Sequence, residues 1–179
     1  MKDFTVKEHK KGSKGPYIFY AITISTSRSE KYGEVTSPQD ADDRSGQLMK
    51  EMIQKAGHEL SGYTLVSDDK DSIVEAIKKA ILSNADIIVT SGGTGLASKD
   101  VTIESVLPMF EKDIPGFGEL FRYKSISQIG ASVILTRASA GTIANKAVFC
   151  LPGSPAAVEL ALGEIIIPEA GHIVKHVKQ

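Results

Sequence analysis

A glycine-rich connection after an apolar run carries the densest group of chemically useful residues in this chain. The run Asp86–Thr90 is rich in β-branched residues, which predicts a buried strand, and hydroxyls and glycines follow it directly. Glycine adopts backbone conformations that are closed to other residues, so such a loop can present several N–H groups to one anion. The sequence therefore predicts a phosphate-binding loop made of Ser91, Gly92, Gly93, Thr94 and Gly95.

A cation and an acid, Lys99 and Asp100, close the same connection. A carboxylate beside a bound phosphate can hold Mg²⁺, which proteins usually bind through one or two carboxylates together with phosphate oxygens. Asp68 follows another predicted strand, and the carboxyl ends of parallel strands meet at one edge of a sheet. Asp68 and Asp100 could therefore share one Mg²⁺, with Lys99 neutralising charge on a reacting phosphate. The alternative for Asp68 is a helix N-cap, a role that Asp69 or Asp71 could equally fill.

Alternating strand and helix patterns surround these residues. Strands are expected at Tyr17–Ser25, Tyr63–Val66, Asp86–Thr90, Ser132–Thr136 and Lys146–Leu151. Helices are expected at Ser45–Ala56 with Asp43 or Ser45 as cap, at Ser72–Leu82, at Glu119–Ile126, and from Pro155 with Ser154 as cap. The polar segment Thr26–Asp42 is expected to be a loop, and Pro115–Gly118 a turn. The pattern predicts a three-layer α/β/α domain, doubly wound around a mostly parallel sheet.

The composition of the chain narrows its class and its partners. With 179 residues, of which 41% are hydrophobic and 24% charged, the chain suits one globular domain at residues 17–179, preceded by a basic arm at residues 1–16. We expect the arm to be mobile, with packing in an oligomer as the alternative. The net charge of -1 argues against nucleic acid as a partner, and no segment is apolar for long enough to suggest a membrane span. The lone Cys150 lies in an apolar run, which predicts a buried side chain and fits a reducing cytoplasm.

Several motifs, taken in order along the chain, resemble those of the MoaB/MogA family of molybdenum cofactor biosynthesis proteins. They are Asp43–Gly46, Thr90–Gly95 followed by Lys99–Thr102, Pro115–Glu119 with Arg122, Thr136–Gly141, and Leu151–Pro155. The resemblance covers the chain from about Tyr17 to its end, and the runs Phe117–Arg122 and Ala140–Lys146 are more similar to the MoaB branch. Each motif alone is weak evidence for the resemblance, whereas the whole set in this order is specific to the family.

The resemblance implies a MogA/MoaB-like fold and molybdopterin adenylyltransferase activity, in which molybdopterin and Mg-ATP give adenylyl-molybdopterin and pyrophosphate. It implies that the loop from Ser91 to Gly95 holds the terminal phosphate of the pterin and that Asp68 and Asp100 support the Mg-ATP chemistry. Further residues implied to line the site are Glu119, Arg122, Thr136, Arg137, Gly153 and Ser154. A homotrimer or homohexamer is also implied, with other enzymes of molybdenum cofactor biosynthesis as candidate partners.

One position departs from the family pattern, and two other functions stay open. Lys99 stands where many adenylylating relatives have arginine. Lysine keeps the positive charge but cannot make the bidentate hydrogen bonds that an arginine guanidinium makes to a phosphate. The first alternative function is a molybdopterin-binding or carrier protein without chemistry, and the second is a flavodoxin-like or other nucleotide-binding scaffold. The acid pair favours an enzyme, because two carboxylates beside a bound phosphate would repel it in the absence of a metal.

Overall fold

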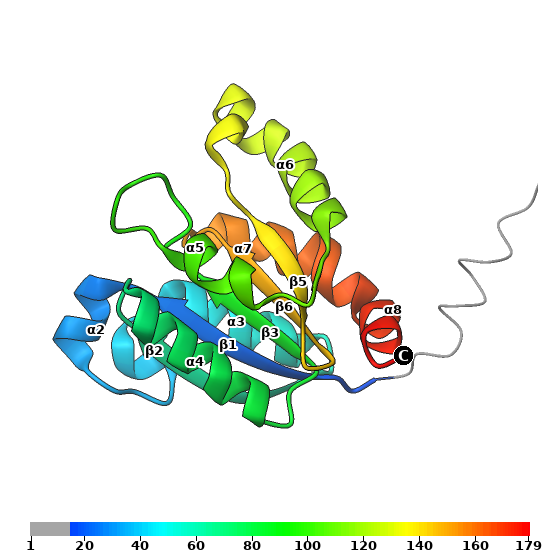
Figure 1. The fold of residues 1–179 in the computed structure, drawn as a ribbon, viewed down its shortest axis with the longest axis horizontal. Helices are drawn as coiled ribbons and strands as arrows, with labels where there is room; N and C mark the ends of the chain where they lie inside the picture. The colour runs from blue at the N-terminus through cyan, green and yellow to red at the C-terminus, as the bar shows by residue number, and fades with distance from the viewer. Residues whose placement is uncertain (1–14) are drawn as a thin grey trace, which may run out of the picture.

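The computed structural model describes residues 15–179, which are built around one six-stranded sheet (Figure 1). The strands are β1 (Ile18–Ile24), β2 (Glu59–Val66), β3 (Ile87–Ser91), β4 (Lys112–Asp113), β5 (Ser139–Ile143) and β6 (Lys146–Leu151). Their order in the sheet is β2-β1-β3-β6-β5-β4. The first four in this order pair in parallel, whereas β5 is antiparallel to β6 and β4 is antiparallel to β5. The predicted α/β class with a mostly parallel sheet is confirmed.

Helices cover both faces of the sheet and make the three layers visible in Figure 1. They are α2 (Thr26–Tyr32), α3 (Arg44–Lys55), α4 (Lys70–Leu82), α5 (Thr102–Val106), α6 (Pro115–Ile129), α7 (Pro155–Ala161) and α8 (Ile167–Val177). One core cluster packs α3, α6, α7 and α8 against a sheet face that includes Val89 and Phe149. The other packs α4 and α5 against the opposite face, which includes Ile88. Because successive strand residues point to opposite faces, the neighbours Ile88 and Val89 serve different cores.

The strand order places the topological switch point of the sheet between β1 and β3. The chain passes from β1 to β2 on one side and later enters β3 on the other side of β1. Ligands of open α/β sheets bind beyond the carboxyl ends of the strands at such a point. Since β1 ends at Ile24 and β3 at Ser91, the predicted phosphate loop begins at the switch point.

The segment Thr26–Asp42 is not the loop that its polar composition predicts. It contains α2 and the short 3₁₀ helix η1 (Pro38–Ala41). None of the residues of α2 is buried, so this helix lacks the apolar stripe that reveals a helix in a sequence. The prediction of a loop was wrong for this reason.

The strand predicted at Ser132–Thr136 is also wrong. Gly130–Leu135 forms the 3₁₀ helix η3, in which the side chain of Ile134 is 81% exposed. The strand is β5, further along the chain, and a tight turn at Ala144–Asn145 joins it to β6. Both turn residues have positive φ angles, 48° and 60°, yet neither is glycine, so the usual sequence signal of a hairpin is missing.

Two further boundaries differ from the sequence pattern, and one cap agrees with it. Helix α6 begins at Pro115, so the predicted turn at Pro115–Gly118 is the first helical turn, where proline is well tolerated. Strand β2 begins earlier than predicted, at Glu59, because it is an edge strand whose first half carries exposed polar residues. Ser154 caps α7 as predicted, since its hydroxyl oxygen accepts the N–H of Ala157 at 3.2 Å.

Residues 1–14, which make up most of the predicted basic arm, lie outside the described residues. Between Gly15 and the C-terminal Gln179, no helix is long and apolar enough to cross a membrane. Cys150 is fully buried in β6, and this burial raises the pKa of its thiol to about 12. The prediction of a buried cysteine is therefore confirmed, and the raised pKa disfavours the thiolate, which is the reactive form.

Replacing Asp69 by alanine is expected to destabilise the fold by about 1 kcal/mol, which lowers Tm by about 2–4 °C. Asp69 is the N-cap of α4, and its Oδ1 accepts the N–H of Ser72 at 2.9 Å. These bonds from Ser72 hold the pKa of Asp69 below its ordinary value, so the stabilisation is present at neutral pH and disappears as the pH falls through that lowered pKa. Thermal unfolding at neutral and acidic pH measures both effects. Asp71→Ala, an exposed acid in the same turn, is the control, and an equal loss in both variants would contradict the assignment.

Candidate functional site

A cavity of about 600 Å³ lies at the carboxyl edge of the sheet, beyond β1, β3 and β6. Its wall includes the end of β1 with the start of α2, the loop after β2, the glycine loop after β3, the segment before β5 and the turn after β6. Its charged lining residues are Asp43, Asp68 and Asp100 together with Arg28, Lys99 and Arg137. Because these charges balance, a ligand that carries several phosphates would need further positive charge in the cavity.

Hydrogen bonds on both sides fix the shape of the glycine loop. The N–H of Gly92 donates to the carbonyl oxygen of Leu151 at 3.0 Å, and the hydroxyl of Thr102 donates to the carbonyl oxygen of Gly92 at 2.9 Å. The N–H of Thr102 donates in turn to the carbonyl oxygen of Gly93 at 2.9 Å. Gly92 and Gly93 have φ angles of +113° and +62°, which side chains other than that of glycine rarely allow.

The loop leaves three consecutive backbone donors unused. Within residues 15–179, the N–H groups of Gly93, Thr94 and Gly95 meet no hydrogen-bond acceptor, and all three residues line the cavity. The hydroxyl of Ser91 is already used, since it donates to the carbonyl oxygen of Pro152 at 3.3 Å. Successive free N–H groups in a concave loop bind oxyanions, so the backbone rather than Ser91 supplies most of the donors.

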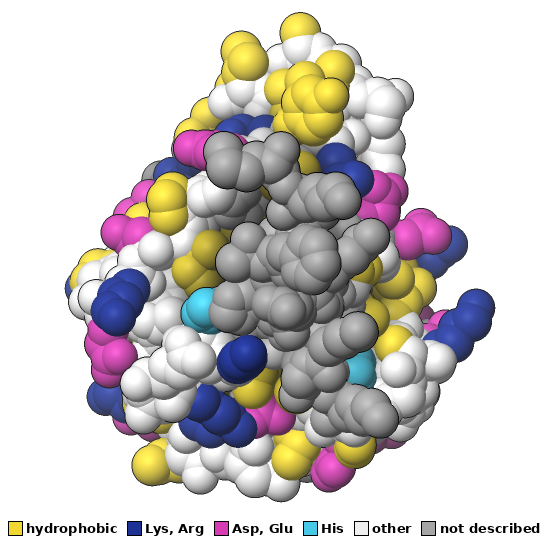
Figure 2. Space-filling view, turned by 90° about the vertical axis from the view of Figure 1, so that its right-hand side faces the viewer, with side chains coloured by type: hydrophobic (Ala, Val, Ile, Leu, Met, Phe, Trp, Pro, Cys, Tyr) yellow, Lys and Arg dark blue, Asp and Glu magenta, His cyan; other side chains and the backbone are white. Residues whose placement is uncertain are grey.

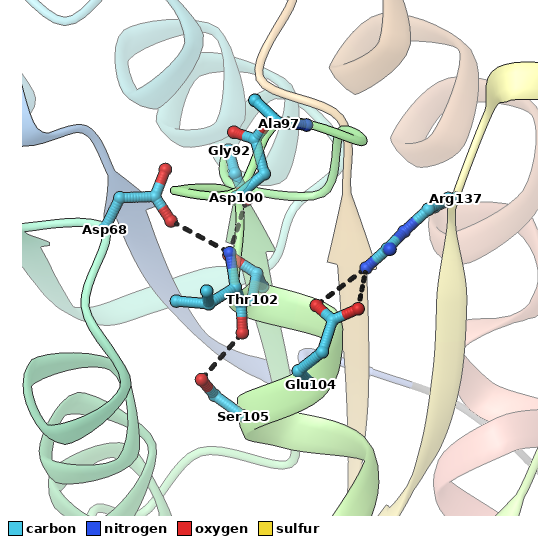
Figure 3. Close-up of polar contacts among 9 residues, drawn as sticks. Asp68, Gly92, Ala97, Asp100, Thr102, Glu104, Ser105 and Arg137 are labelled. Carbon is cyan, nitrogen blue, oxygen red and sulfur yellow. Dashed lines mark hydrogen bonds and ion pairs between the residues drawn. The ribbon is translucent and has the colours of Figure 1, made fainter.

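The acids Asp68 and Asp100 both lie beside the glycine loop (Figure 3). Asp68 Oδ1 accepts the N–H of Val101 at 3.4 Å, and Asp100 Oδ2 accepts the N–H of Ala97 at 3.1 Å. Each carboxylate therefore keeps one oxygen that is not engaged by these bonds. The alternative role of Asp68 as a helix cap does not apply, because Asp69 is the N-cap of α4.

The glycines make room for these two carboxylates. A Cβ atom on Gly93 would overlap Asp68 Oδ1, and one on Gly95 would lie 2.6 Å from Asp100 Oδ2. No third His, Cys, Asp or Glu side chain joins them in a metal-binding group within residues 15–179. Two carboxylates with open coordination positions suit Mg²⁺, because it usually takes its other ligands from substrate phosphates and water.

The electrostatic environment of Asp68 favours binding of a cation. Burial raises the pKa of Asp68, the N–H of Val101 opposes this, and the negative charge of Asp100 raises the pKa further. The ionised pair is thus disfavoured in the empty site, and a cation held between the carboxylates would relieve the repulsion. Metal binding is expected to weaken as the pH falls and Asp68 takes up a proton.

Arg137 enters the cavity wall from the segment before β5 and is held by an acid on α5. Its Nη2 donates to both carboxylate oxygens of Glu104 at 2.7 Å (Figure 3), and these bonds hold the pKa of Glu104 below its ordinary value. The Nε of Arg137 is buried and has no hydrogen-bond partner in the part of the chain that the structure describes. A buried donor without an acceptor costs about 1–3 kcal/mol, so a ligand oxygen at this position would bind favourably.

Replacing Glu104 by glutamine is expected to raise the Kd or KM for a phosphate-bearing substrate about threefold to tenfold, because the guanidinium of Arg137 loses its fixed orientation. The free energy of unfolding is expected to change by less than about 0.5 kcal/mol, since Glu104 is exposed. Substrate titration and thermal unfolding measure the two quantities. Glu164→Gln removes the exposed ion pair with Lys124 and is the control. An unchanged affinity in Glu104→Gln would contradict the positioning role.

Most of the residues predicted for the site lie together in this cavity. They are Asp68, Ser91, Gly92, Gly93, Thr94, Gly95, Lys99, Asp100, Thr136, Arg137, Gly153 and Ser154. Glu119 and Arg122 lie on α6 and are not among the residues that line it. Arg122 instead contacts the first turn of its own helix, where a Cβ on Gly118 would lie 3.1 Å from Arg122 Nη1.

The cavity also contains residues that sequence reasoning did not assign to a site. Arg28 comes from α2, in the segment predicted to be a loop, and Asp43 comes from the start of α3, where the sequence offers it as a helix cap and as part of the Asp43–Gly46 motif. Ser45 lines the cavity too, and its hydroxyl donates to the carbonyl oxygen of Gly153 at 2.9 Å. The only sequence signal for Asp43 and Ser45 was the motif that they share, and Arg28 had none.

Sequence comparison places the chain among proteins of one biosynthetic route. Residues 20–172 match the family model described as a probable molybdopterin binding domain. The chain is 43% identical over 171 residues to the molybdenum cofactor biosynthesis protein B of Bacillus cereus, covering 94% of this chain and 95% of the relative. It is 38% identical over 177 residues to the protein of the same name from Bacillus subtilis, covering 98% of each.

Structural comparison agrees with the sequence. A crystal structure of the tungsten cofactor synthesizing protein MoaB from Pyrococcus furiosus superposes with a TM-score of 0.81 at 41% identity, covering 93% of this chain and 99% of the other. A MogA structure at 24% identity has a TM-score of 0.76, covers 89% of this chain and 99% of the other, and shares the fold. The family model over residues 20–172 and the identity to these relatives over nearly the whole chain show that it belongs to the MoaB family of molybdenum cofactor biosynthesis proteins.

Proposed function

We propose that this protein is a molybdopterin adenylyltransferase, which joins the adenylyl group of ATP to the terminal phosphate of molybdopterin and releases pyrophosphate. The observation that carries the proposal is the convergence of Asp68 and Asp100 on a loop with three free N–H groups in one cavity. A protein that only held a phosphate would be hindered by two carboxylates beside it, because they repel an anion unless a cation is bound.

The reaction suits a site that positions its substrates and needs no strong base. A phosphomonoester is largely dianionic at neutral pH, because its second pKa is about 6. One of its oxygens attacks the α-phosphorus of ATP, a P–O–P bond forms, and the bond to the departing pyrophosphate breaks. The N–H groups of Gly93, Thr94 and Gly95 orient the attacking phosphate, and Lys99 neutralises charge that develops on the reacting phosphates. Bound Mg²⁺, held by Asp68 and Asp100, would stabilise the charge on pyrophosphate.

The test is single-turnover formation of adenylyl-molybdopterin and pyrophosphate from molybdopterin and Mg-ATP by the purified chain. Product that depends on Mg²⁺ supports the proposal.

A second candidate is a molybdopterin-binding or carrier protein without chemistry. This candidate is favoured by Lys99, because a lysine ammonium group provides a single point charge where an arginine guanidinium group would make bidentate hydrogen bonds to a phosphate. Tight binding of molybdopterin with no product under any divalent metal would contradict the enzyme and support the carrier.

We further propose that the protein forms a homotrimer or homohexamer. An exposed apolar patch at the end of α6 and on η3 supports this, and Figure 2 shows yellow side chains gathered at the top of the molecule over this region. The patch consists of Tyr123, Ile126, Ile129, Ile134 and Leu135. Contiguous apolar surface of this kind commonly marks an interface. Sedimentation of the wild type and of Ile134→Glu tests the proposal, and a monomeric wild type would contradict it.

The setting of the proposed reaction follows from its substrates. ATP is abundant in the cytoplasm, so we propose a cytoplasmic location. Mg²⁺, ATP and molybdopterin are the proposed ligands.

The product is an activated phosphoanhydride of a pterin, so the enzymes that consume it are the expected protein partners. Copurification of such an enzyme with the tagged chain would support this, and its absence after mild crosslinking would contradict it.

A further inference from the structure

The cavity has a buried carboxylate that the proposed phosphate chemistry does not use. Asp43 lines the cavity, yet only 1% of its surface is exposed. It occupies the N-cap position of α3, but its side chain makes no capping hydrogen bond to the helix. Burial of a carboxylate is costly, and a cap is the ordinary use of an acid at this position, so the inward orientation needs another reason.

The described hydrogen bonds of this carboxylate all fall on one of its oxygens. Thr23 Oγ1 donates to Asp43 Oδ2 at 2.6 Å, and the hydroxyl of Tyr63 donates to the same Oδ2 at 2.8 Å. Burial raises the pKa of Tyr63, and the negative charge of Asp43 raises it further, so Tyr63 stays protonated as a donor. Within residues 15–179, Asp43 Oδ1 has no hydrogen-bond partner and no cation forms an ion pair with the carboxylate.

The chain makes specific room for this arrangement. A Cβ atom on Gly46 would overlap Asp43 Oδ2 and would lie 2.9 Å from the ring of Tyr63. Glycine within a helix costs about 0.5–1 kcal/mol relative to alanine. The helix therefore carries a destabilising residue at the position that allows Asp43 to turn toward the cavity. Thr23 and Tyr63 fix the orientation of the carboxylate, and Oδ1 remains as a recessed acceptor.

A recessed carboxylate oxygen accepts N–H groups and repels phosphates and carbonyl oxygens. The heterocycle that suits it has two neighbouring N–H donors, as in the 2-amino-4-oxopyrimidine ring, where a ring N–H adjoins an exocyclic amine. The same edge occurs in pterins and in guanine. The pairing edge of adenine offers one amine next to a ring nitrogen acceptor, which a carboxylate would repel. The chemistry of the oxygen thus favours one class of ring.

We propose that Asp43 Oδ1 accepts hydrogen bonds from the 2-amino-4-oxopyrimidine edge of the ligand and thereby makes the cavity select a pterin-type ring over adenine. The inference rests on the proposed function in one respect, which is that a pterin occupies this cavity. The carboxylate lies in the same cavity as the glycine loop, so one ligand can place its ring at Asp43 and its phosphate at Gly93–Gly95. Asp43 is then a specificity-determining residue.

The test is fluorescence titration of the full chain, without ATP or metal, with pterin and with lumazine. Lumazine carries a carbonyl oxygen where pterin carries the 2-amino group, so the pair isolates the contact with Asp43. The wild type is expected to bind pterin about 10- to 100-fold more tightly than lumazine. Asp43→Asn is expected to reduce this ratio to about threefold or less, because an amide can donate to the lumazine oxygen. Tyr20→Phe is the matched control, since it removes a tyrosine hydroxyl that pairs with Thr64 rather than with Asp43 and lies outside the cavity, and it is expected to keep the ratio.

Three outcomes separate this inference from its alternatives. An equal affinity of the wild type for pterin and lumazine would overturn it, even if Asp43→Asn fails to fold. A ratio that survives in Asp43→Asn would also overturn it and leave Asp43 as an anchor between α3, β1 and β2. Guanosine and inosine differ by the same amine and form the second ligand pair, in which an Asp43-dependent preference for guanosine is expected beside the preference for pterin. Because no turnover is measured, failure of adenylyl transfer leaves the result intact.

Discussion

Replacing Asp100 or Asp68 by asparagine is expected to lower the single-turnover rate of adenylyl transfer by about 10²- to 10⁴-fold. Both carboxylates lie beside the glycine loop, and each has an oxygen that is not engaged by its described hydrogen bond. In the proposed reaction, loss of either carboxylate would weaken the binding of the cation that balances the triphosphate and stabilises the charge on pyrophosphate. Quenched-flow measurement with saturating molybdopterin and Mg-ATP reads this rate directly.

The same substitutions are expected to leave the fold intact. Asparagine keeps a side-chain oxygen that can accept the N–H of Val101 in place of Asp68, or of Ala97 in place of Asp100. Because burial and Asp100 raise the pKa of Asp68, its ionised form destabilises the folded state above that pKa, and an uncharged amide removes this cost. Tm at neutral pH is therefore expected to stay constant or to rise slightly in Asp68→Asn.

The control for this prediction is the neighbouring acid Asp69, which is the N-cap of α4 and does not line the cavity. Asp69→Asn makes the same chemical change one residue along, and asparagine is an equally good cap. Its turnover is expected to match that of the wild type. Wild-type turnover in both Asp68→Asn and Asp100→Asn would refute the assignment of the metal site, whereas a rate loss in Asp69→Asn as well would indicate a general structural effect.

Replacing Gly92 by alanine is expected to destabilise the protein by about 3 kcal/mol or more and to lower Tm by about 6–12 °C. The φ angle of Gly92 is +113°, which L side chains rarely adopt. A Cβ atom at this position would also overlap the backbone carbonyl oxygen of Ile24, at the end of β1, which cannot move aside as a flexible side chain could. Binding of molybdopterin is expected to be lost together with the loop conformation.

Gly116→Ala provides the matched control for Gly92→Ala. Gly116 lies in the first turn of α6, has no atom within 4 Å of a Cβ built on it, and lies outside the cavity. Alanine there is expected to leave Tm unchanged or to raise it slightly, because alanine favours a helix more than glycine does. Thermal unfolding monitored by circular dichroism compares the two variants. Equal Tm values for Gly92→Ala and the wild type would show that the loop adapts without strain.

Local sequence patterns were enough to predict the central parallel strands of the sheet and the glycine loop with its neighbouring acids. The strands β1, β3 and β6 follow from β-branched runs, and the cap of α7 follows from a serine before a proline. The glycine loop and the acids that follow the strands could be placed at one edge because parallel strands end together. Prediction failed at α2, β5 and the start of α6, where helix, strand and turn signals were absent or misleading.

Contacts between distant parts of the chain decided the rest of the site. Asp43 faces the cavity because Thr23 and Tyr63, each 20 positions away, hold its carboxylate and Gly46 leaves space for it. Arg137 is held by Glu104, which is 33 positions away on another element. A local sequence pattern does not predict such contacts, because the direction of a side chain depends on which distant groups the folded chain brings beside it. The sequence therefore located the glycine loop and the acids beside it. The inward carboxylate of Asp43, the contact of Arg137 with Glu104, and the absence of Glu119 and Arg122 from the cavity lining became visible only in the folded structure.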